Sequence, residues 1–387
     1  MIKTVSGNRF DWSKILRIII KTVVLFLVFN LLFAWFDPIH VLGELSVYNT
    51  FIPGRVRLPY GDDPQRSYNL TVTQLEAMIA SHEFRGAHES PDEFRILILG
   101  DSSVWGFLLP HDETLAAKIT AGDYRTADGG RVRAYNFGYP TMSLLKDLVL
   151  LERALDFNPD FIVWLFTLES FPREKQIESP LVQYNPEQAR ALIERYHLDL
   201  DPLDARFTTS SFWERTIVGR RKMLADLFRL QLYGVLWASS TVDRHIPETY
   251  NRLMEDLSAD QTFHGHLPGD LAREDLAFDV LSGGIQAAGD IPVLLVNEPV
   301  FISEGENSDI RYNFYYPRWA YDAYRRWMKE LCLEFGWDYM DLWDLLSANS
   351  FTDSAIHYDS QAADTLAQTI ATAVLERVDG SPVECGD

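Results

Sequence analysis

The sequence predicts an α/β domain, a parallel sheet flanked by helices, which is joined to one N-terminal transmembrane helix and carries a helical insertion. Apolar, strand-like runs alternate with helical stretches in two parts of the chain, which is typical of parallel sheets. A long apolar segment lies near the N-terminus, and residues 171–288 interrupt the alternation. The chain has 387 residues, of which 47% are hydrophobic, enough for a sizeable core.

The N-terminal segment, residues 15–36, is apolar apart from four polar residues. As a helix it would be about 33 Å long, which matches the hydrocarbon core of a bilayer. Five basic residues against Asp11 within the first 21 residues predict a cytoplasmic N-terminus. A cleaved signal peptide is the alternative, but residues 32–38 lack its small-x-small pattern. We therefore expect a cytoplasmic tail at 1–14, a single-pass anchor at 15–36 and an extracytoplasmic domain.

The elements after the anchor follow from periodicity and from breakers. Residues 37–93 are punctuated by Pro and Gly and read as a lead-in or stalk, with one helix predicted over 73–81. The main domain is expected over 94–380. Its predicted elements are strand 95–99, helix 113–121, strand 131–136, helix 143–155, strand 161–166, strand 291–296, helix 317–335, strand 337–340 and helix 360–375.

A serine follows the first predicted strand in the motif Gly100-Asp101-Ser102. A serine hydroxyl is a weak nucleophile, so it needs an imidazole that accepts its proton and a carboxylate that orients the imidazole. His357 and Asp353, near the C-terminus, can fill these two roles. Gly-Asp-Ser is also an ordinary turn, and the adjacent Ser103 is a second possible nucleophile.

Two further blocks follow, Tyr135-Asn136-Phe137-Gly138-Tyr139-Pro140 and Pro159-Asp160-Phe161-Ile162-Val163-Trp164-Leu165-Phe166. With Gly-Asp-Ser and the late Asp/His pair, their order resembles the SGNH, or GDSL, hydrolase family over residues 94–170 and 290–377. The resemblance implies a three-layer, flavodoxin-like sheet and a catalytic triad of Ser102, Asp353 and His357. It also implies oxyanion donors at the backbone of Ser102 and Gly138, with no metal or cofactor.

The sequence departs from the family pattern at two positions. The family has an Asn, the third oxyanion donor, in the stretch that corresponds to residues 166–169, where this chain has none. Losing one such donor typically costs about 3–4 kcal/mol of transition-state stabilisation. Asn297, at the end of the next strand, is the expected substitute, although it can equally be a turn residue. Asp353 also lies four residues before His357 instead of three, which an irregular loop can absorb.

The insertion contains one long helical pattern, residues 216–237, with a basic head and an apolar body. Asp226 and Arg229 exclude a second membrane span. The segment can lie in the membrane interface, cover the active site as a lid, or pack inside a helical subdomain. His264-Gly265-His266 reads as a solvated loop rather than a metal pair. The two cysteines, Cys332 and Cys385, permit a disulfide without implying one.

Net charge narrows the possible functions. The chain carries −21, and the first 21 residues are themselves positive, so the domain is acidic and nucleic acid is excluded as a partner. We expect a serine esterase or O-acyltransferase that acts on acyl esters of envelope glycans or lipids, in the periplasm or at the cell surface. In plan it is similar to anchored proteins of alginate O-acetylation and teichoic-acid D-alanylation, which suggests a membrane-bound acyl-donor protein as partner. The alternatives are a membrane-associated lipase or thioesterase, and a catalytically impaired binding or assembly protein.

Overall fold

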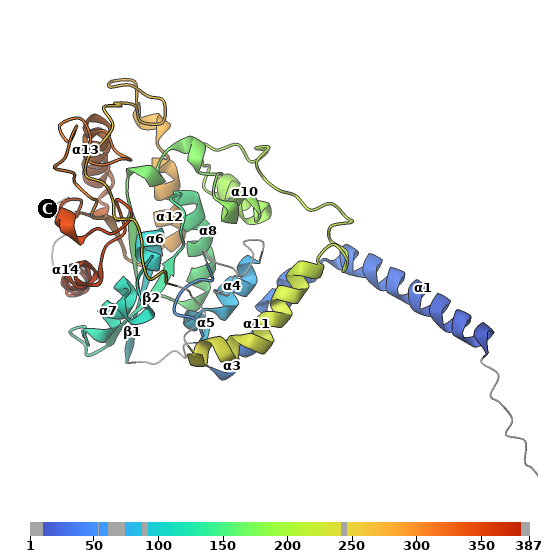
Figure 1. The fold of residues 1–387 in the computed structure, drawn as a ribbon. Coiled ribbons are helices and arrows are strands. Elements are labelled where there is room, and N and C mark those ends of the chain that lie inside the picture. The colour runs from blue at the N-terminus through green and yellow to red at the C-terminus, as the bar shows by residue number, and fades with distance from the viewer. Residues whose placement is uncertain (1–10, 53, 61–73, 87–91, 241–245, 381–387) are drawn as a thin grey trace, which may run out of the picture.

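The computed structural model describes residues 11–52, 54–60, 74–86, 92–240 and 246–380. Its centre is a sheet of five parallel strands in the order β2-β1-β3-β4-β5 (Figure 1). The strands are β1 (Glu93–Gly100), β2 (Arg131–Gly138), β3 (Phe161–Phe166), β4 (Val293–Asn297) and β5 (Asp338–Asp341). The predicted fold class, a parallel α/β sheet with flanking helices, is confirmed.

The α-helices are α1 (Trp12–Phe36), α2 (Ile39–Glu44), α3 (Val47–Phe51), α4 (Leu75–Ser81), α5 (Glu83–Gly86), α6 (Ser102–Trp105), α7 (Leu115–Ala121), α8 (Leu144–Ala154), α9 (Pro180–Gln183), α10 (Pro186–Arg195), α11 (Arg221–Ser240), α12 (Phe278–Ala288), α13 (Arg318–Phe335) and α14 (Ser360–Val378).

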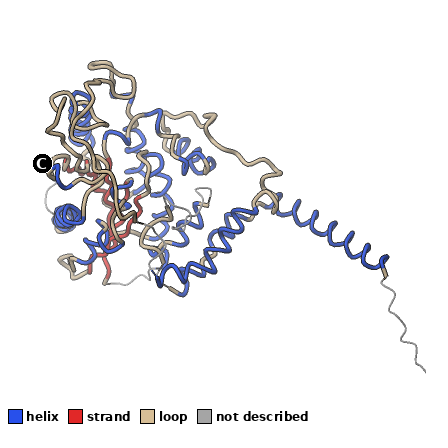
Figure 2. The backbone as a smooth tube through the Cα atoms, viewed as in Figure 1, coloured by secondary structure: helices blue, strands red, loops and turns tan. Residues whose placement is uncertain are grey.

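The sheet is buried on both faces, which explains why its central strands are almost continuously apolar. Because successive strand residues point to opposite faces, Ile96 and Ile98 of β1 pack with α7 and α14. Leu97 and Leu99 pack on the other side, with α8, α12 and α13. Figure 2 shows the strands enclosed by these helices. The result is a three-layer arrangement with one hydrophobic core on each side of the sheet.

Strand order places the carboxyl end of β1 at the position where a site is expected. The chain runs from β1 to β2 on one side and then crosses to β3 on the other side of β1. Loops that leave β1 and β3 therefore diverge and open a crevice, which is the usual ligand site of doubly wound sheets. Ser102 lies in the segment after β1, which ends at Gly100, and Glu169 lies in the segment after β3, which ends at Phe166.

The first helix, α1, stands apart from the domain (Figure 1). It has 25 residues, and an 18-residue window within it has a mean hydropathy of 2.4, so it is the one helix among the described residues long and apolar enough to cross a membrane. The lead-in that follows is packed against the domain. Every residue of α4 is buried, and Leu75 and Met78 belong to the larger core. The buried Arg57 donates to the backbone carbonyls of Gly106 and Leu109.

The insertion is divided between core and surface. Helix α12 and part of α10 pack against α8 and contribute to the larger core. Helix α11 instead lies along α2 and α3, on the side of the domain from which α1 projects (Figure 1). Several predicted features lie outside the described residues, namely residues 1–10 of the tail, parts of the lead-in at 53 and 61–73, the start of the predicted 73–81 helix and Cys385.

Candidate active site

Three side chains from distant parts of the chain meet at the carboxyl end of β1. His357 Nε2 lies 2.7 Å from Ser102 Oγ, and His357 Nδ1 lies 2.8 Å from Asp353 Oδ1. Burial on its own would raise the pKa of Asp353, but the hydrogen bond and the charge of His357 outweigh it and lower that pKa. Phe107 stacks on the imidazole with ring centroids 4.6 Å apart, which fixes the ring plane. The structure thus brings together all three residues of the predicted triad.

The turn that presents Ser102 is built from its neighbours. Asp101 caps the short helix α6, since its side chain accepts a hydrogen bond of 2.9 Å from the Ser103 backbone N–H. Ser102 is the first residue of α6 and is partly exposed. Ser103 is buried and points inward, where its hydroxyl donates to the Glu298 carboxylate. Of the two serines, Ser102 is the one that faces His357.

A buried lysine holds the two strand ends that form the floor of the crevice. Lys146, on α8, donates from Nζ to the backbone carbonyls of Gly100 at 2.8 Å and Tyr139 at 3.1 Å. Its ammonium also pairs with Asp147, which accepts a hydrogen bond from Trp164 as well. Burial raises the pKa of Asp147 to about 6, although the charge of Lys146 opposes the shift. Lys146 therefore ties β1 to β2 directly beneath the serine turn.

A second carboxyl group lies beneath that turn. Glu298, the residue after β4, is fully buried, and burial together with the negative charge of Asp101 raises its pKa well above its ordinary value. Its Oε2 accepts from Ser103, while Glu298 Oε1 and Asp101 Oδ2 have no other hydrogen-bond partner among the described residues. A hydrogen bond between Glu298 and Asp101 favours the protonated form of Glu298. Burial and the nearby charge of Asp101 therefore favour a protonated Glu298.

Two predicted oxyanion donors are engaged elsewhere. The Gly138 N–H donates to Asn136 Oδ1 at 3.0 Å, and a Cβ at this position would lie 2.3 Å from the Trp105 backbone nitrogen, so the glycine serves close packing against α6. The Asn297 side chain is completely buried. Its Nδ2 donates to Asp341 Oδ1 at 2.7 Å, and its Oδ1 accepts from Tyr321 and Tyr324 of α13. Alternate residues of a strand point to opposite faces of the sheet, and Asn297 points to the face covered by α13. The structure therefore does not bring Asn297 to the triad.

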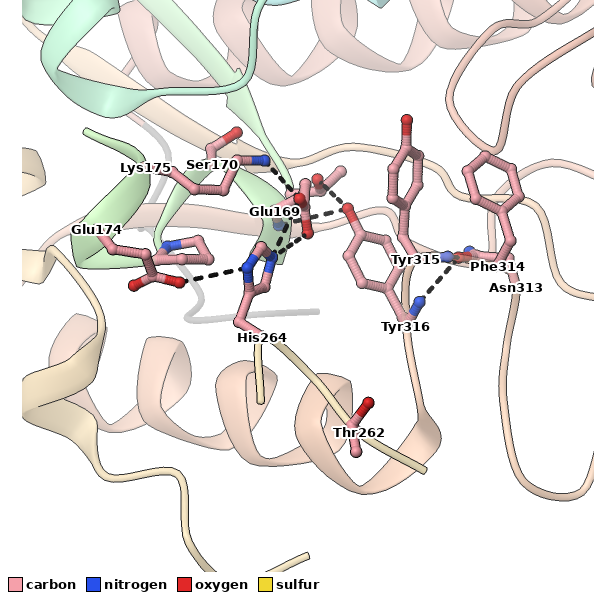
Figure 3. Close-up of polar contacts among 12 residues, drawn as sticks. Glu169, Ser170, Glu174, Lys175, Thr262, His264, Asn313, Phe314, Tyr315 and Tyr316 are labelled. Atoms are coloured by element: carbon pink, nitrogen blue, oxygen red, sulfur yellow. Dashed lines mark hydrogen bonds and ion pairs between the residues drawn. The ribbon is translucent and has the colours of Figure 1, made fainter. Parts of the chain in front are cut away.

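The end of β3, where the family has its Asn, holds an ion-pair cluster (Figure 3). His264 lies between two carboxylates, with Nε2 3.1 Å from Glu169 and Nδ1 3.2 Å from Glu174. Hydrogen bonds to these carboxylates raise the pKa of His264 to about 9 against the effect of burial. Lys175 also pairs with Glu169. His264 and Gly265 lie in an exposed turn. The contact of His264 with Glu169, 95 residues away, has no local sequence signal.

Two tyrosines stand beside this cluster (Figure 3). The Tyr316 hydroxyl lies within hydrogen-bond distance of Thr167 Oγ1 and accepts from the Glu169 backbone N–H. Tyr315 lies between the cluster and the triad, since its hydroxyl bonds to Ser354 and its pKa, raised mainly by burial, also responds to the charges of Glu169 and Asp353. The backbone N–H groups of both tyrosines donate to the Asn313 side chain. The tyrosines form a fixed wall between β3 and the triad loop.

A pocket of about 430 Å³ adjoins the acid of the triad. It is lined by most of the segment 251–260, by Arg311 and Phe314, and by Asp353 itself. Arg311 is buried and donates to the backbone carbonyls of Asp260 at 2.6 Å and Phe314 at 2.8 Å, so two sides of the pocket are joined through it. Amide, carboxylate and hydroxyl groups alternate in the lining with Leu, Met and Phe side chains. Such a lining suits a polar ligand that also has an apolar face.

Within the described residues, no group of three or more His, Cys, Asp and Glu side chains is arranged to hold a metal ion. No protein-family model and no curated protein sequence matches the chain. Among solved structures, the chain is 12% identical to a carbohydrate acetylesterase family member from Sinorhizobium meliloti, over 74% of this chain and 99% of that one, with a TM-score of 0.33. A gut microbial diltiazem-metabolizing enzyme is 9% identical over 74% of this chain and 48% of its own, with a TM-score of 0.35. Similarities this low carry no argument about the site.

Proposed function

We propose that this protein is a serine-dependent esterase or O-acyltransferase of the SGNH type that acts on acyl esters. The observation that carries the proposal is the pair of contacts of His357, 2.7 Å to Ser102 Oγ and 2.8 Å to Asp353 Oδ1. An imidazole held on both sides in this way can accept the serine proton in one defined tautomer. The lowered pKa of Asp353 keeps it ionised, so that it stabilises the imidazolium.

The reaction proceeds in two halves. Ser102 Oγ attacks the acyl carbonyl carbon while its proton passes to His357 Nε2. The ester C–O bond then breaks, His357 returns the proton to the leaving alcohol, and the acyl group stays on Ser102. Water or a second hydroxyl, deprotonated by His357, then attacks the acyl-serine and releases Ser102. Hydrolysis and transfer differ only in this acceptor, and the backbone N–H of Ser102 remains the proposed oxyanion donor.

Polar groups around the triad favour a glycan substrate over a lipid. The pocket beside Asp353 is lined by amide, carboxylate and guanidinium groups, with Phe314 on one side. Hydroxyl-rich rings offer hydrogen bonds to such groups and an apolar face to an aromatic ring, whereas an acyl chain would leave them unpaired. For a transferase, a membrane-bound acyl-donor protein is the proposed partner.

We also propose that α1 anchors the protein in a membrane, with the N-terminus cytoplasmic and the catalytic domain outside. The length and hydropathy of α1 and the basic residues at its start support this orientation. An alkaline phosphatase fused to the C-terminus should be active, and an inactive fusion would contradict the orientation.

The catalytic proposal is tested with a fluorophosphonate probe on the full chain in detergent. Wild type should be labelled, while Ser102→Ala and His357→Ala should not. Ser103→Ala is the matched control, because Ser103 faces Glu298, and it should keep its labelling. A folded wild type that is not labelled would favour the binding or assembly function, and labelling that persists in Ser102→Ala would refute the assigned nucleophile.

A further inference from the structure

Helix α11 presents an apolar face to solvent. Phe228, Leu232 and Leu236, spaced four residues apart, are 71%, 62% and 58% exposed. The opposite face of the same helix packs on the domain, since Leu227 and Leu230 are buried. Residues four apart share one side of a helix, so the exposed side chains form a continuous stripe. The helix is therefore attached to the domain by one side and leaves a second apolar side uncovered.

The neighbouring helices extend this surface. Val41 of α2 and Phe51 of α3 are 65% and 78% exposed, and Leu45 between the two helices is 62% exposed. Gln231 of α11 joins the helices, because it donates to the Leu45 carbonyl at 2.9 Å and accepts from the Val47 N–H at 2.6 Å. We call α2, α3 and the exposed side of α11 the apolar platform. A platform of this kind is unusual on a surface in contact with water only.

The platform is fixed to the end of α1. Asn30, a polar residue near the end of that helix, accepts a hydrogen bond of 3.2 Å from the Val218 N–H. Asp37, the C-cap of α1, pairs with Arg220 at 3.1 Å. Figure 1 shows α11 and α3 on the side of the domain that faces α1. The exposed apolar surface of α1 and that of the platform thus meet where α1 ends.

Positive charge gathers at the same place, although the chain as a whole carries −21. Residues 213–236 contain five basic and two acidic residues, and one of the acids, Asp226, is buried. A cavity of about 150 Å³ is lined by three arginines, Arg190, Arg215 and Arg220, against two carboxylates, Asp37 and Glu187, together with His40 and several uncharged residues. Cations around the end of a membrane helix lie at the depth of the lipid headgroups.

From these observations we propose that the apolar platform lies on the outer surface of the same bilayer that α1 crosses, with anionic phospholipid headgroups at the arginine-lined cavity. A bilayer is the occupant because the platform continues the surface of α1, and α1 is long and apolar enough to cross a membrane. An amphipathic helix with basic and bulky apolar residues buries its apolar side at the boundary of headgroups and acyl chains. This inference depends on the proposed anchoring by α1 and not on the proposed catalysis.

The test uses the full chain in nanodiscs that contain a phospholipid with a photoreactive diazirine in its acyl chain. After illumination, cross-linked peptides are mapped by mass spectrometry. We expect cross-links in α1 and also in residues 41–51 and 228–236. Cross-links confined to α1 would overturn the platform while leaving the anchor intact, and none in α1 would overturn the anchor itself.

Two variants make the test specific. Phe228→Glu with Leu232→Glu should remove most cross-links from α11 and leave those in α1 unchanged. Leu333→Glu is the matched control, because Leu333 is 70% exposed on α13, away from the platform, and it should change nothing. Fluorophosphonate labelling and thermal unfolding report whether each variant is folded. Discs that hold two copies of the chain and give no lipid cross-links in α11 would instead identify a dimer interface and refute the lipid assignment.

Lipid composition tests the charge part of the proposal. Discs of phosphatidylglycerol should give more α11 cross-links than discs of phosphatidylcholine, at equal yield in α1. Arg215→Gln should reduce this difference, because Arg215 lines the cavity and its Nε is buried without a hydrogen-bond partner among the described residues. Equal yields in the two lipids would overturn the anionic headgroup site.

Discussion

The buried Glu298 carboxyl beneath the serine turn makes a direct prediction about how the stability of the fold depends on pH. Glu298 is fully buried and its pKa lies well above the ordinary value of 4.5, so the folded protein keeps a proton that the unfolded chain loses. Such a group stabilises the fold fully below its unfolded pKa, and this stabilisation is lost as pH rises through the folded pKa. The perturbation is Glu298→Gln, which has the same shape, donates to Asp101 and accepts from Ser103, but cannot ionise.

The size of the expected change in stability follows from the ionisation of one carboxyl group. Between the unfolded and the folded pKa of Glu298, wild type loses about 1.4 kcal/mol of unfolding free energy per pH unit through this residue. For a domain of this size that is roughly 2 °C in melting temperature per pH unit. Other titrating groups, such as Asp147, are common to both proteins and cancel in the comparison. Glu298→Gln should therefore gain stability relative to wild type as pH rises above about 4.5.

The assay is thermal unfolding of the full chain in detergent, followed by intrinsic fluorescence at pH 5, 6, 7 and 8. Glu376→Gln, at an exposed position, is the control, and its melting temperature should depend on pH in the same way as that of wild type. If the melting temperature of Glu298→Gln changes with pH in the same way as that of wild type over this range, then Glu298 is not protonated in the folded protein.

Three further predictions concern neighbouring parts of the site. Asp353→Asn should slow fluorophosphonate labelling by at least about 100-fold, because an amide does not stabilise the His357 imidazolium, and an unchanged labelling rate would contradict the triad. Lys146→Met leaves Asp147 buried without its cation and should lower the unfolding free energy, measured with denaturant, by about 3–5 kcal/mol. The double variant Lys146→Met with Asp147→Asn should recover most of this loss. No recovery would mean that the loss comes mainly from the hydrogen bonds of Lys146 to the strand ends. The pKa of His264 is raised to about 9 from 6.5, so its stabilising effect is complete below pH 6.5 and is lost as pH rises through 9. His264→Gln should therefore reduce the fall in melting temperature between pH 7 and pH 10. An unchanged pH dependence of the melting temperature would show that these ion pairs do not stabilise the fold.

Local sequence patterns predicted most of the fold. Continuous apolar runs such as Ile96–Leu99 predicted buried parallel strands, because both faces of such a sheet are covered. The predicted strand 161–166 matches β3 at both ends, and the predicted strand 291–296 begins two residues before β4. The Gly336 stop also placed the end of α13 correctly, since Gly336 adopts a left-handed conformation with φ of 67°.

The surroundings of the triad were less predictable, because they depend on contacts between distant segments. Nothing local distinguishes Lys146 from an exposed helix lysine, yet it is buried against the ends of β1 and β2. Asn297 and Glu298 are adjacent at the end of β4, and only the strand's parity decides which one faces Ser103. The position of Glu298, directly after a parallel strand, was the one available signal. The catalytic roles of Ser102, Asp353 and His357 stay predictions until the labelling experiment.

The short connection between α1 and the domain limits what the protein can reach. Helix α1 ends at Phe36, and Ile39 of α2, three residues later, is already buried in the main core. Asp37, between them, forms an ion pair with Arg220, so the junction is a fixed connection rather than a flexible linker. With α1 in the bilayer, the active site would stand at a set height above the lipid surface. Substrates would then have to come within that height, which favours newly exported or membrane-attached glycans over polymers deep in the envelope.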